Sequence, residues 1–261
     1  TQAPFDFGNR QPLVQTFKEI ATNEGITVAV NHFKSKGSCG SASGNNADIN
    51  DGQGCWNGLR TQAANSLTAW LDTLPTGTTD TDVLIMGDLN AYAKEDPITA
   101  IEANGYQNLV EKSLGHNGYS YSFGGELGYL DHALASSSLT SQVVETTVWH
   151  INADEPRSFD YNTEFKSANQ LNTYYGSDAY RASDHDPVVI SLNLASASSL
   201  LGDFDSDGDV DRNDLTAFTL LLRSGETLDI KNDFNNDGAV NTRDVRSLMS
   251  LCTRSRCAAE Q

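Results

Sequence analysis

The chain has 261 residues, which is enough for one large or two modest domains with hydrophobic cores of their own. Its 35 acidic and 17 basic residues give a formal net charge of −18, so any nucleic-acid binding must be local or rely on metal ions. No apolar run approaches the ~20 residues that a bilayer-spanning helix needs, so the sequence predicts no membrane insertion.

The four cysteines form two close pairs, Cys39 with Cys55 and Cys252 with Cys257. Neither pair has a zinc-type partner set nearby, so the spacing favours two local disulfides and an oxidising compartment. The chain begins at Thr1 with neither a methionine nor an apolar leader, and we therefore expect a signal peptide to have been removed. These features predict a secreted protein, either extracellular or associated with a cell surface.

Strands and helices alternate over residues 1–194, beginning with two predicted strands at 13–20 and 26–31 joined by a turn. Apolar residues recur at helical spacing from Leu59 to Leu74, and Pro75 ends that helix. A short buried strand at 83–86 then delivers the motif GDLN to its C-terminal end. A second helix follows, with Asp96 as its cap and Pro97 at its first position.

Three further strands are predicted in YSYSF (119–123), YLDHALAS (129–136) and QVVETTVWHI (142–151), and a last one begins at Val188. The aromatic residues of YSYSF suit stacking on a sugar or base, but aromatic residues in strands more often belong to the core. The pattern predicts a mixed α+β domain with polar motifs at the ends of its strands.

Asp184, His185 and Asp186 stand directly before Pro187 and the last strand. A carboxylate beside an imidazole orients the ring and raises its basicity, as a general base or a metal site requires. Aspartate and proline are also common around turns, so this motif alone favours a structural role. A functional interpretation needs partners elsewhere in the chain.

Other strand ends supply such partners. The candidates are Asn31, His32, Lys34 and Lys36 in VNHFKSKG, Asp88 and Asn90 in GDLN, Asp131 in YLDHAL, and Asp184 and His185 in SDHD. Each motif alone is weak, and a solvated loop is the alternative for the lysines. Together they provide carboxylates for a hard divalent cation, imidazoles for proton transfer, and amide and ammonium donors for phosphate oxygens. Phosphodiester hydrolysis requires this combination.

The order and wording of these motifs resemble the endonuclease/exonuclease/phosphatase superfamily, which has the deoxyribonuclease I-like fold. NHFKSKG, MGDLNAY and WHINADEP resemble its secreted bacterial nuclease branch, and the resemblance covers residues 8–194. It implies the C-terminal portion of a four-layer α/β/β/α sandwich, because the chain opens near the middle of the family pattern. Glu19 and Glu24 come too late to replace the family's early metal-binding glutamate, so we expect a fragment of a longer precursor.

The resemblance also implies a role for each residue. His185 would be the general base that activates water, and Asp131 would orient its ring. His32 would donate a proton at the scissile phosphate, and Asn90 would hydrogen-bond the transition state. The remaining implied roles are Asp88 and Asp184 at or beside a catalytic Mg²⁺ or Mn²⁺, and Arg10, Asn31, Lys34 and Lys36 as substrate contacts.

Three further histidines are not assigned to the site. Strand alternation sends His132 to the face opposite Asp131, so we expect it to pack in the core. His116 and His150 have no chemical partner that the sequence alone reveals.

A small, polar segment at 195–202 is the predicted linker to a repeat that occupies residues 203–261. DFDSDGDVDRND at 203–214 recurs as DFNNDGAVNTRD at 233–244, and both copies place glycine at position 6. Oxygen ligands at alternating positions wrap Ca²⁺, and position 7 offers its carbonyl. The predicted ligands are Asp203, Asp205, Asp207, Asp209, Asp211 and Asp214, then Asp233, Asn235, Asp237, Ala239, Asn241 and Asp244.

Each calcium loop leads into a short helical pattern with one apolar face, at 215–222 and 245–251. Two loops that are each followed by a single helix, with aspartate at position 12, resemble a type I dockerin module. Such a module implies a cohesin-type partner on a scaffold protein or cell surface. The tail CTRSRC departs from that pattern, and similar repeats also serve as calcium-stabilised spacers. The sequence therefore does not decide whether a cohesin-type partner exists.

The sequence as a whole predicts a secreted, divalent-metal-dependent nuclease that hydrolyses extracellular DNA. One alternative is a secreted phosphodiesterase or phosphatase for a smaller phosphoester, such as a phospholipid headgroup. The other is a non-catalytic fragment that accompanies a calcium-dependent docking module.

Overall fold

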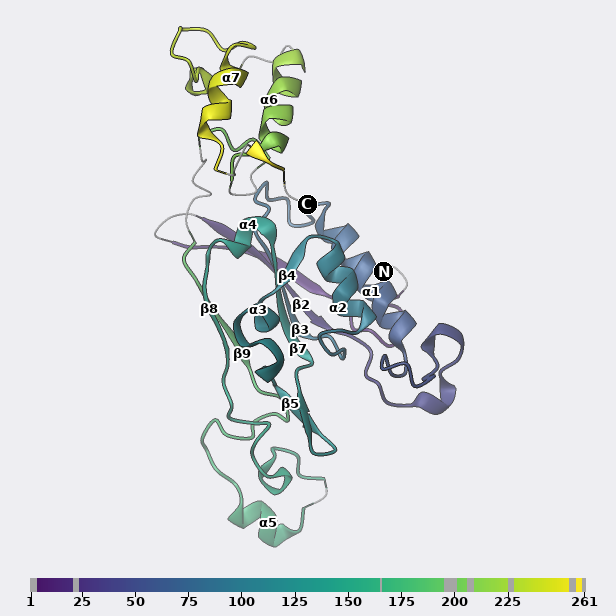
Figure 1. Ribbon diagram of the computed structural model, residues 1–261. Coiled ribbons are helices and arrows are strands. Elements are labelled where there is room, and N and C mark those ends of the chain that lie inside the picture. Colours follow the sequence, from purple (N-terminus) through teal and green to yellow (C-terminus); the bar gives the residue numbers. More distant parts are fainter. Residues whose placement is uncertain are drawn as a thin grey trace. The chain divides into compact units, whose positions relative to one another are not determined.

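The computed structural model describes residues 4–20, 24–164, 166–194, 201–205, 209–224, 228–253 and 257–259. The chain divides into two compact units, Thr1–Asn193 and Leu194–Gln261 (Figure 1). Most of the predicted linker and the predicted calcium ligand Asp207 lie outside the described residues. Over the part of the chain that is described, no helix is both long and apolar enough to span a bilayer.

A five-stranded sheet forms the centre of the first unit, with the strand order β1-β2-β3-β7-β4. β2 and β3 run parallel, and the other neighbours are antiparallel. The strands are β1 Leu13–Lys18, β2 Gly25–His32, β3 Val83–Asp88, β4 Tyr106–Asn108 and β7 Asp131–Ser136. Two antiparallel pairs complete the strands, β5 Tyr121–Phe123 with β6 Glu126–Gly128 and β8 Val143–Val148 with β9 Val188–Leu192.

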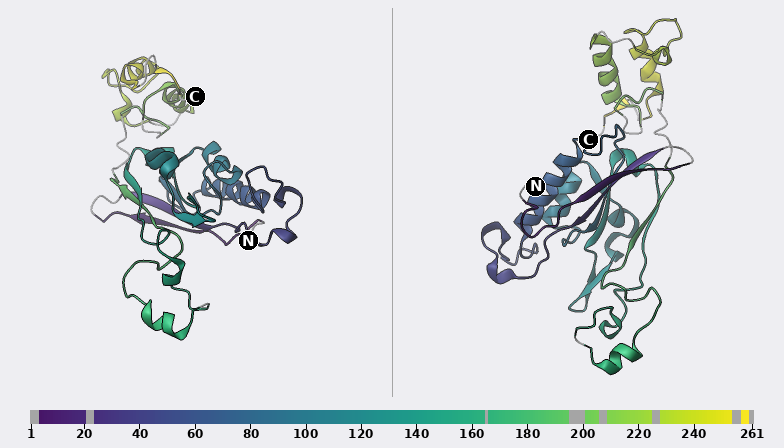
Figure 2. Two further views of the ribbon diagram at one scale, coloured as in Figure 1. Left: turned by 60° about the horizontal axis from the view of Figure 1, so that its bottom comes forward. Right: turned by 180° about the vertical axis from the view of Figure 1, so that it is seen from behind.

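Helices α1 (Asn57–Leu71) and α2 (Asp96–Ala103) cover one face of the five-stranded sheet, and the β8-β9 pair lies on its other side (Figures 1 and 2). The core lies under these helices, where Leu67 and Ile98 pack with Ile85 of β3. Short elements fill the connections: η1 Cys39–Ser41, η2 Gly44–Asn46, α3 Leu109–Leu114, η3 Gly115–Asn117, α4 Ser137–Thr140, η4 Arg157–Phe159 and α5 Ala168–Thr173. The predicted mixed α/β fold is confirmed.

Two local predictions need correction. The N-cap of α2 is Glu95 rather than Asp96, and the Asp96 carboxylate instead accepts a hydrogen bond from Asn57 Nδ2 at 2.6 Å, which ties α2 to α1. The aromatic residues of β5 are not all in the core, because Phe123 on this hairpin is 69% exposed. Among the described strands, β5 and β6 pair only with each other.

Gly87 is required by the close approach of β2 and β3 beside the site. It has φ +124°, and a Cβ atom there would lie 2.0 Å from the Asn31 carbonyl oxygen. Gly87→Ala is therefore expected to destabilise the first unit by about 3 kcal/mol or more, since it combines backbone strain with an overlap in the sheet. Thermal unfolding followed by circular dichroism measures this.

Gly77→Ala is the matched control. Gly77 also has a positive φ, +78°, but an added Cβ would meet nothing within 4 Å. The melting temperature of Gly77→Ala should fall much less than that of Gly87→Ala. An equal fall in melting temperature in the two variants would show that the contact with Asn31 is unimportant.

The second unit is small and contains α6 (Arg212–Ser224), η5 (Ile230–Asn232), α7 (Asp244–Leu248) and η6 (Met249–Leu251). Its core is formed by Val210, Phe218 and Leu248, against which Phe204 and Phe234 pack. Phe204 and Phe234 hold the same place in the two repeats, so the repeats share one core. Both predicted disulfides are present, Cys252 with Cys257 here and Cys39 with Cys55 in the first unit.

Candidate active site

Three of the predicted catalytic residues lie in one row across the sheet, at the ends of β2, β3 and β7. The strand register pairs His32 with Asp88 and Asp88 with Asp131. Side chains of directly paired residues leave a sheet on the same face, so all three project the same way. Nε2 of His32 lies 3.6 Å from Oδ2 of Asp88.

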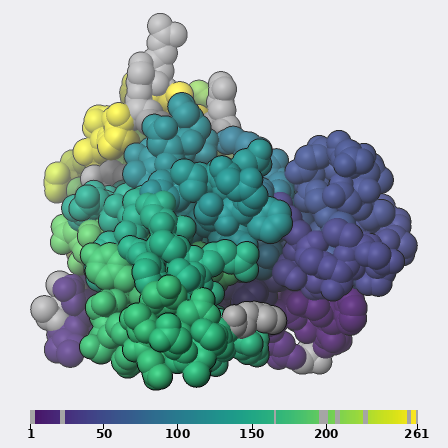
Figure 3. All heavy atoms as spheres, turned by 90° about the horizontal axis from the view of Figure 1, so that it is seen from below, coloured from purple at the N-terminus to yellow at the C-terminus, as the bar shows by residue number. Residues whose placement is uncertain are grey.

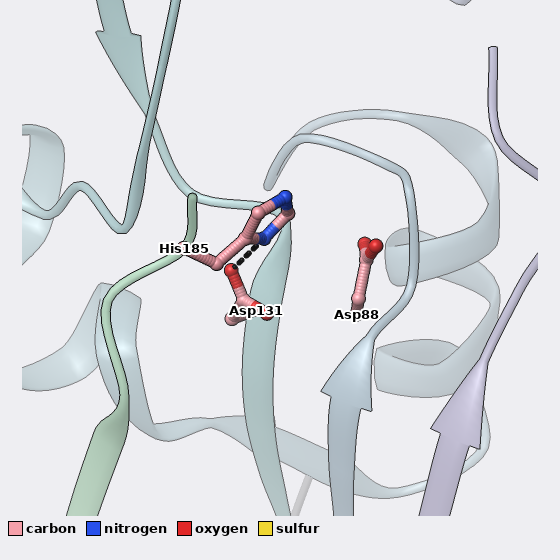
Figure 4. Close-up of side chains that lie close together, drawn as sticks. All are labelled: Asp88, Asp131 and His185. Atoms are coloured by element: carbon pink, nitrogen blue, oxygen red, sulfur yellow. Dashed lines mark hydrogen bonds and ion pairs between the residues drawn. The ribbon is translucent and has the colours of Figure 1, made fainter. Parts of the chain in front are cut away.

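His185 completes the group from the connection that leads into β9. Its Nδ1 is 2.6 Å from Oδ2 of Asp131, and Figure 4 shows the two side chains meeting beside Asp88. Ser120 Oγ donates to the same Asp131 oxygen at 2.6 Å. Because Asp131 engages Nδ1, the imidazole has Nε2 left to exchange a proton with a substrate or water.

Asn90 fixes the carboxylate of Asp88. Its backbone N–H donates to Oδ1 at 2.8 Å, and its side-chain amide donates to Oδ2 at 2.9 Å. The amide also reaches the Phe33 carbonyl at 3.1 Å. Asn90 has φ 49°, a left-handed conformation that asparagine tolerates better than most residues. The motif GDLN thus shapes a turn that presents one oriented carboxylate.

The site concentrates negative charge in a partly buried place. Ligand atoms of Asp88, Asp131 and His185 all lie within 4.8 Å of one another. Burial raises the pKa of Asp88, and the charge of Asp131 adds to this effect. Burial alone would lower the pKa of His185, but the hydrogen bond and charge of Asp131 outweigh it, so the pKa is raised above its ordinary value.

This electrostatic arrangement predicts a pH effect. A general base must be neutral, so activity should rise with pH through the pKa of His185. Asp131 raises that pKa, so Asp131→Asn should move the acidic limb of the kcat/KM profile to lower pH while reducing the plateau. Profiles measured between about pH 5 and pH 9 test this.

Asp184→Asn is the matched control for the pH profile. The exposed Asp184 carboxylate raises the pKa of His185 only through its charge, and less than Asp131 does. Its acidic limb should move in the same direction by a smaller amount. An unmoved limb in Asp131→Asn would show that another group controls activity.

The other predicted site residues lie outside this cluster. Asp184 is exposed and is not one of the three clustered ligands. Asn31 is only 4% exposed, and its amide donates to the Ala29 carbonyl at 2.8 Å within the sheet, so its contact with a substrate stays a prediction. Arg10 has an exposed side chain, and its backbone N–H donates to the His32 carbonyl at 3.0 Å, which places it beside the site.

The two predicted phosphate-binding lysines have partners within the protein. Lys36 forms an ion pair with the buried Glu95. Lys34 donates to the carbonyls of Ser35 and Gly37 and lies over the Trp56 ring at 5.1 Å. These contacts hold the loop around the Cys39–Cys55 disulfide, and the predicted contact of both lysines with phosphate stays a prediction.

Sequence reasoning missed a second histidine–carboxylate pair beside the first. His150 Nδ1 lies 2.8 Å from Oδ2 of the buried Asp186. The other oxygen of Asp186 accepts the backbone N–H groups of residues 151–153 at 2.8–3.1 Å. Tyr119 stacks on the His150 ring with 4.0 Å between centroids. The two residues are 36 positions apart, so no local pattern in the sequence points to this pair.

His132 packs as predicted, on the face opposite Asp131. It is 1% exposed, and its Nε2 contacts the Ala91 carbonyl at 2.8 Å. Burial lowers the pKa of His132 to about 4, so the ring stays neutral inside the core.

The sequence matches the model of the endonuclease/exonuclease/phosphatase family over residues 13–185. A curated relative, the long isoform of ulvan lyase from Glaciecola sp. (strain KUL10), is 47% identical over 78 residues, which are 30% of this chain and 8% of that protein. The chain spans 8–10% of the length of the ulvan lyases that it matches.

Two solved structures are similar at low identity. The mannosyl-6-phosphatase of Bacteroides thetaiotaomicron is 18% identical with a TM-score of 0.44, covering 68% of this chain and 55% of that one. The beta toxin of Staphylococcus aureus is 16% identical with a TM-score of 0.41, covering 69% of this chain and 56% of that one.

Proposed function

This chain belongs to the endonuclease/exonuclease/phosphatase family, whose members hydrolyse phosphoesters, and on that premise we propose that it is a secreted, metal-dependent nuclease for extracellular DNA. The observation that carries the proposal is the His185–Asp131 pair, 2.6 Å apart, beside the row of His32 and Asp88. His185 is a base whose ring is oriented by Asp131, and His32 offers a second imidazole on the other side of the Asp88 carboxylate. Two such groups suit the hydrolysis of a phosphodiester. The two disulfides support an oxidising, extracellular setting.

The residues take complementary roles in this proposal. Nε2 of His185 accepts a proton from the attacking water, and Asp131 stabilises the imidazolium that forms. Ser120 holds Asp131 in place through its hydroxyl. His32, which is 40% exposed, donates a proton to the departing ester oxygen. Asn90 keeps the Asp88 carboxylate oriented through its backbone N–H and its side-chain amide.

The donor set of this site fits a divalent metal ion. Asp88 and Asp131 bring two carboxylates within 4.8 Å of each other, and oxygen ligands are those that Mg²⁺ and Mn²⁺ prefer. The raised pKa of Asp88 reflects burial and like charge, which a cation would offset. A bound Mg²⁺ or Mn²⁺ would neutralise charge on the phosphate oxygens.

The second unit is proposed to bind Ca²⁺ in both repeats. In the first, Asp214 is buried and accepts the backbone N–H groups of Asp205 and Asp211 at 3.2 and 2.7 Å. In the second, Asp244 accepts those of Asn235 and Asn241 at 3.1 and 2.8 Å. The matching pattern supports two equivalent loops, each built around the aspartate at position 12 that is the proposed calcium ligand.

Plasmid digestion tests the catalytic proposal. The full-length protein with Mg²⁺ should nick and linearise supercoiled DNA, and EDTA should stop the reaction. Parallel assays on a sugar phosphate monoester and on phospholipid vesicles compare the alternative substrates. If the protein hydrolysed either alternative substrate but left the plasmid uncut, that result would contradict the nuclease proposal.

A further inference from the structure

A cavity of ≈ 660 Å³ lies in the long connection between β8 and β9, in residues 155–182. Figure 1 shows this connection around α5, and in Figure 3 its residues form the green surface in front. Five aromatic side chains line the cavity: Phe159, Tyr161, Tyr174, Tyr175 and Tyr180. Each is between 40% and 80% exposed. So many exposed rings in one short segment mark an interaction site rather than a core.

A buried cation also lines this cavity. Arg181 is only 6% exposed, and its Nε has no hydrogen-bond partner. The guanidinium donates through one terminal nitrogen to the Asn152 carbonyl at 2.5 Å. A buried, incompletely paired guanidinium is costly unless an acceptor completes its hydrogen bonds, and it matches phosphate oxygens well.

The cavity is joined to the catalytic histidine. Asn152 accepts a hydrogen bond from Arg181 through its backbone carbonyl. Its side-chain amide donates to the His185 carbonyl at 2.7 Å. On the catalytic side of His185, the Tyr121 ring lies 4.5 Å from the imidazole ring. Asn152 therefore links Arg181 in the cavity wall to the backbone of His185.

Charge alone does not make this cavity a polyanion site. Lys166 is neutralised by Asp160 at 2.7 Å, and Glu155 and Asp178 also line the walls. Recognition must therefore rest on the faces of the rings together with the single guanidinium. Nucleobases stack on aromatic side chains without regard to sequence.

We infer that this cavity binds an unpaired nucleotide of the substrate strand next to the scissile phosphate, an inference that rests on the proposed nuclease function. The base stacks on an exposed ring face of the pair Phe159 and Tyr174, which pack edge to face with 5.2 Å between centroids, and its phosphate pairs with Arg181. The cavity would thus favour single-stranded or locally opened DNA.

Binding measurements test this site apart from catalysis. The full-length protein carrying His185→Ala is titrated with a fluorescent thymidine 12-mer and with a 12-mer of abasic sites. Phe159→Ala/Tyr174→Ala in that background should weaken binding of the thymidine 12-mer about tenfold or more. The double variant should change the affinity for the abasic 12-mer by no more than about twofold, because stacking needs bases. Trp70→Ala, which removes a ring 40% exposed on α1, is the control and should change neither.

Each outcome has a separate meaning. Unchanged affinity for the thymidine 12-mer in the double variant would overturn the nucleotide site. An equal loss for the abasic 12-mer would also overturn it, because the cavity would then recognise sugar and phosphate alone. Failure of the unmodified protein to cut plasmid would instead count against the proposed function, and the binding assay would still report on the cavity.

Discussion

His185→Ala is expected to reduce the rate of DNA cleavage about 100-fold or more while leaving the fold intact. His185 has the only imidazole that contacts Asp131 among the described residues, and its Nδ1 is held at 2.6 Å. Alanine removes the proton acceptor and leaves the backbone, including the carbonyl that Asn152 contacts, in place. Nicking of supercoiled plasmid gives the rate, and circular dichroism checks the fold.

His116→Ala is the matched control, because His116 is exposed and lies in the short η3 helix away from the clustered residues. That variant should cut DNA at the unmodified rate. Asp88→Asn should be impaired as severely as His185→Ala, since the clustered carboxylates are the proposed metal ligands. A near-normal rate in His185→Ala would remove this residue from the mechanism.

Calcium removal is expected to unfold the second unit. The first loop gathers Asp203, Asp205 and Asp214 within 4.8 Å, and Asp209 and Asp211 approach Asp214 equally closely. Like charges at this spacing repel by more than a core of three fully buried side chains can offset. Circular dichroism of residues 200–261 should show most of the helical signal lost in EDTA and recovered with Ca²⁺. Mg²⁺ should restore it poorly, because it prefers six ligands at ~2.1 Å.

Asp214→Ala and Asp229→Ala separate the loop from the rest of this unit. Asp214 ties the first loop together, whereas Asp229 is an exposed cap of η5. The Asp214→Ala variant should need a much higher Ca²⁺ concentration to recover its helical signal, and the Asp229→Ala variant should not. A full helical signal in EDTA would mean that calcium does not fold the unit, and the Cys252–Cys257 disulfide would become the better explanation.

The sequence predicted those parts of the site that depend on strand ends. His32, Asp88 and Asp131 each stand at the end of an apolar run, and the strand register brings them together. Strand alternation also placed His132 correctly in the core. Such features follow from local pattern, because side chains alternate between the faces of a strand.

Features that depend on long-range packing were not predicted. Lys36 meets Glu95 across 59 residues, and His150 meets Asp186 across 36. Nothing in the local sequence of these residues reveals the partner, since each pair forms only when separate loops fold together. The aromatic cavity could not be predicted for a similar reason, because its aromatic residues lie in an irregular part of the chain and follow neither helical nor strand periodicity.

The distance in sequence between Asp131 and His185 has a consequence for biosynthesis. The two residues are 54 positions apart, and the chain between them includes β8 and the whole aromatic connection. A growing chain that ends before residue 185 therefore has no catalytic pair, whatever else has folded. Contacts this far apart also form late, because a long loop must close first.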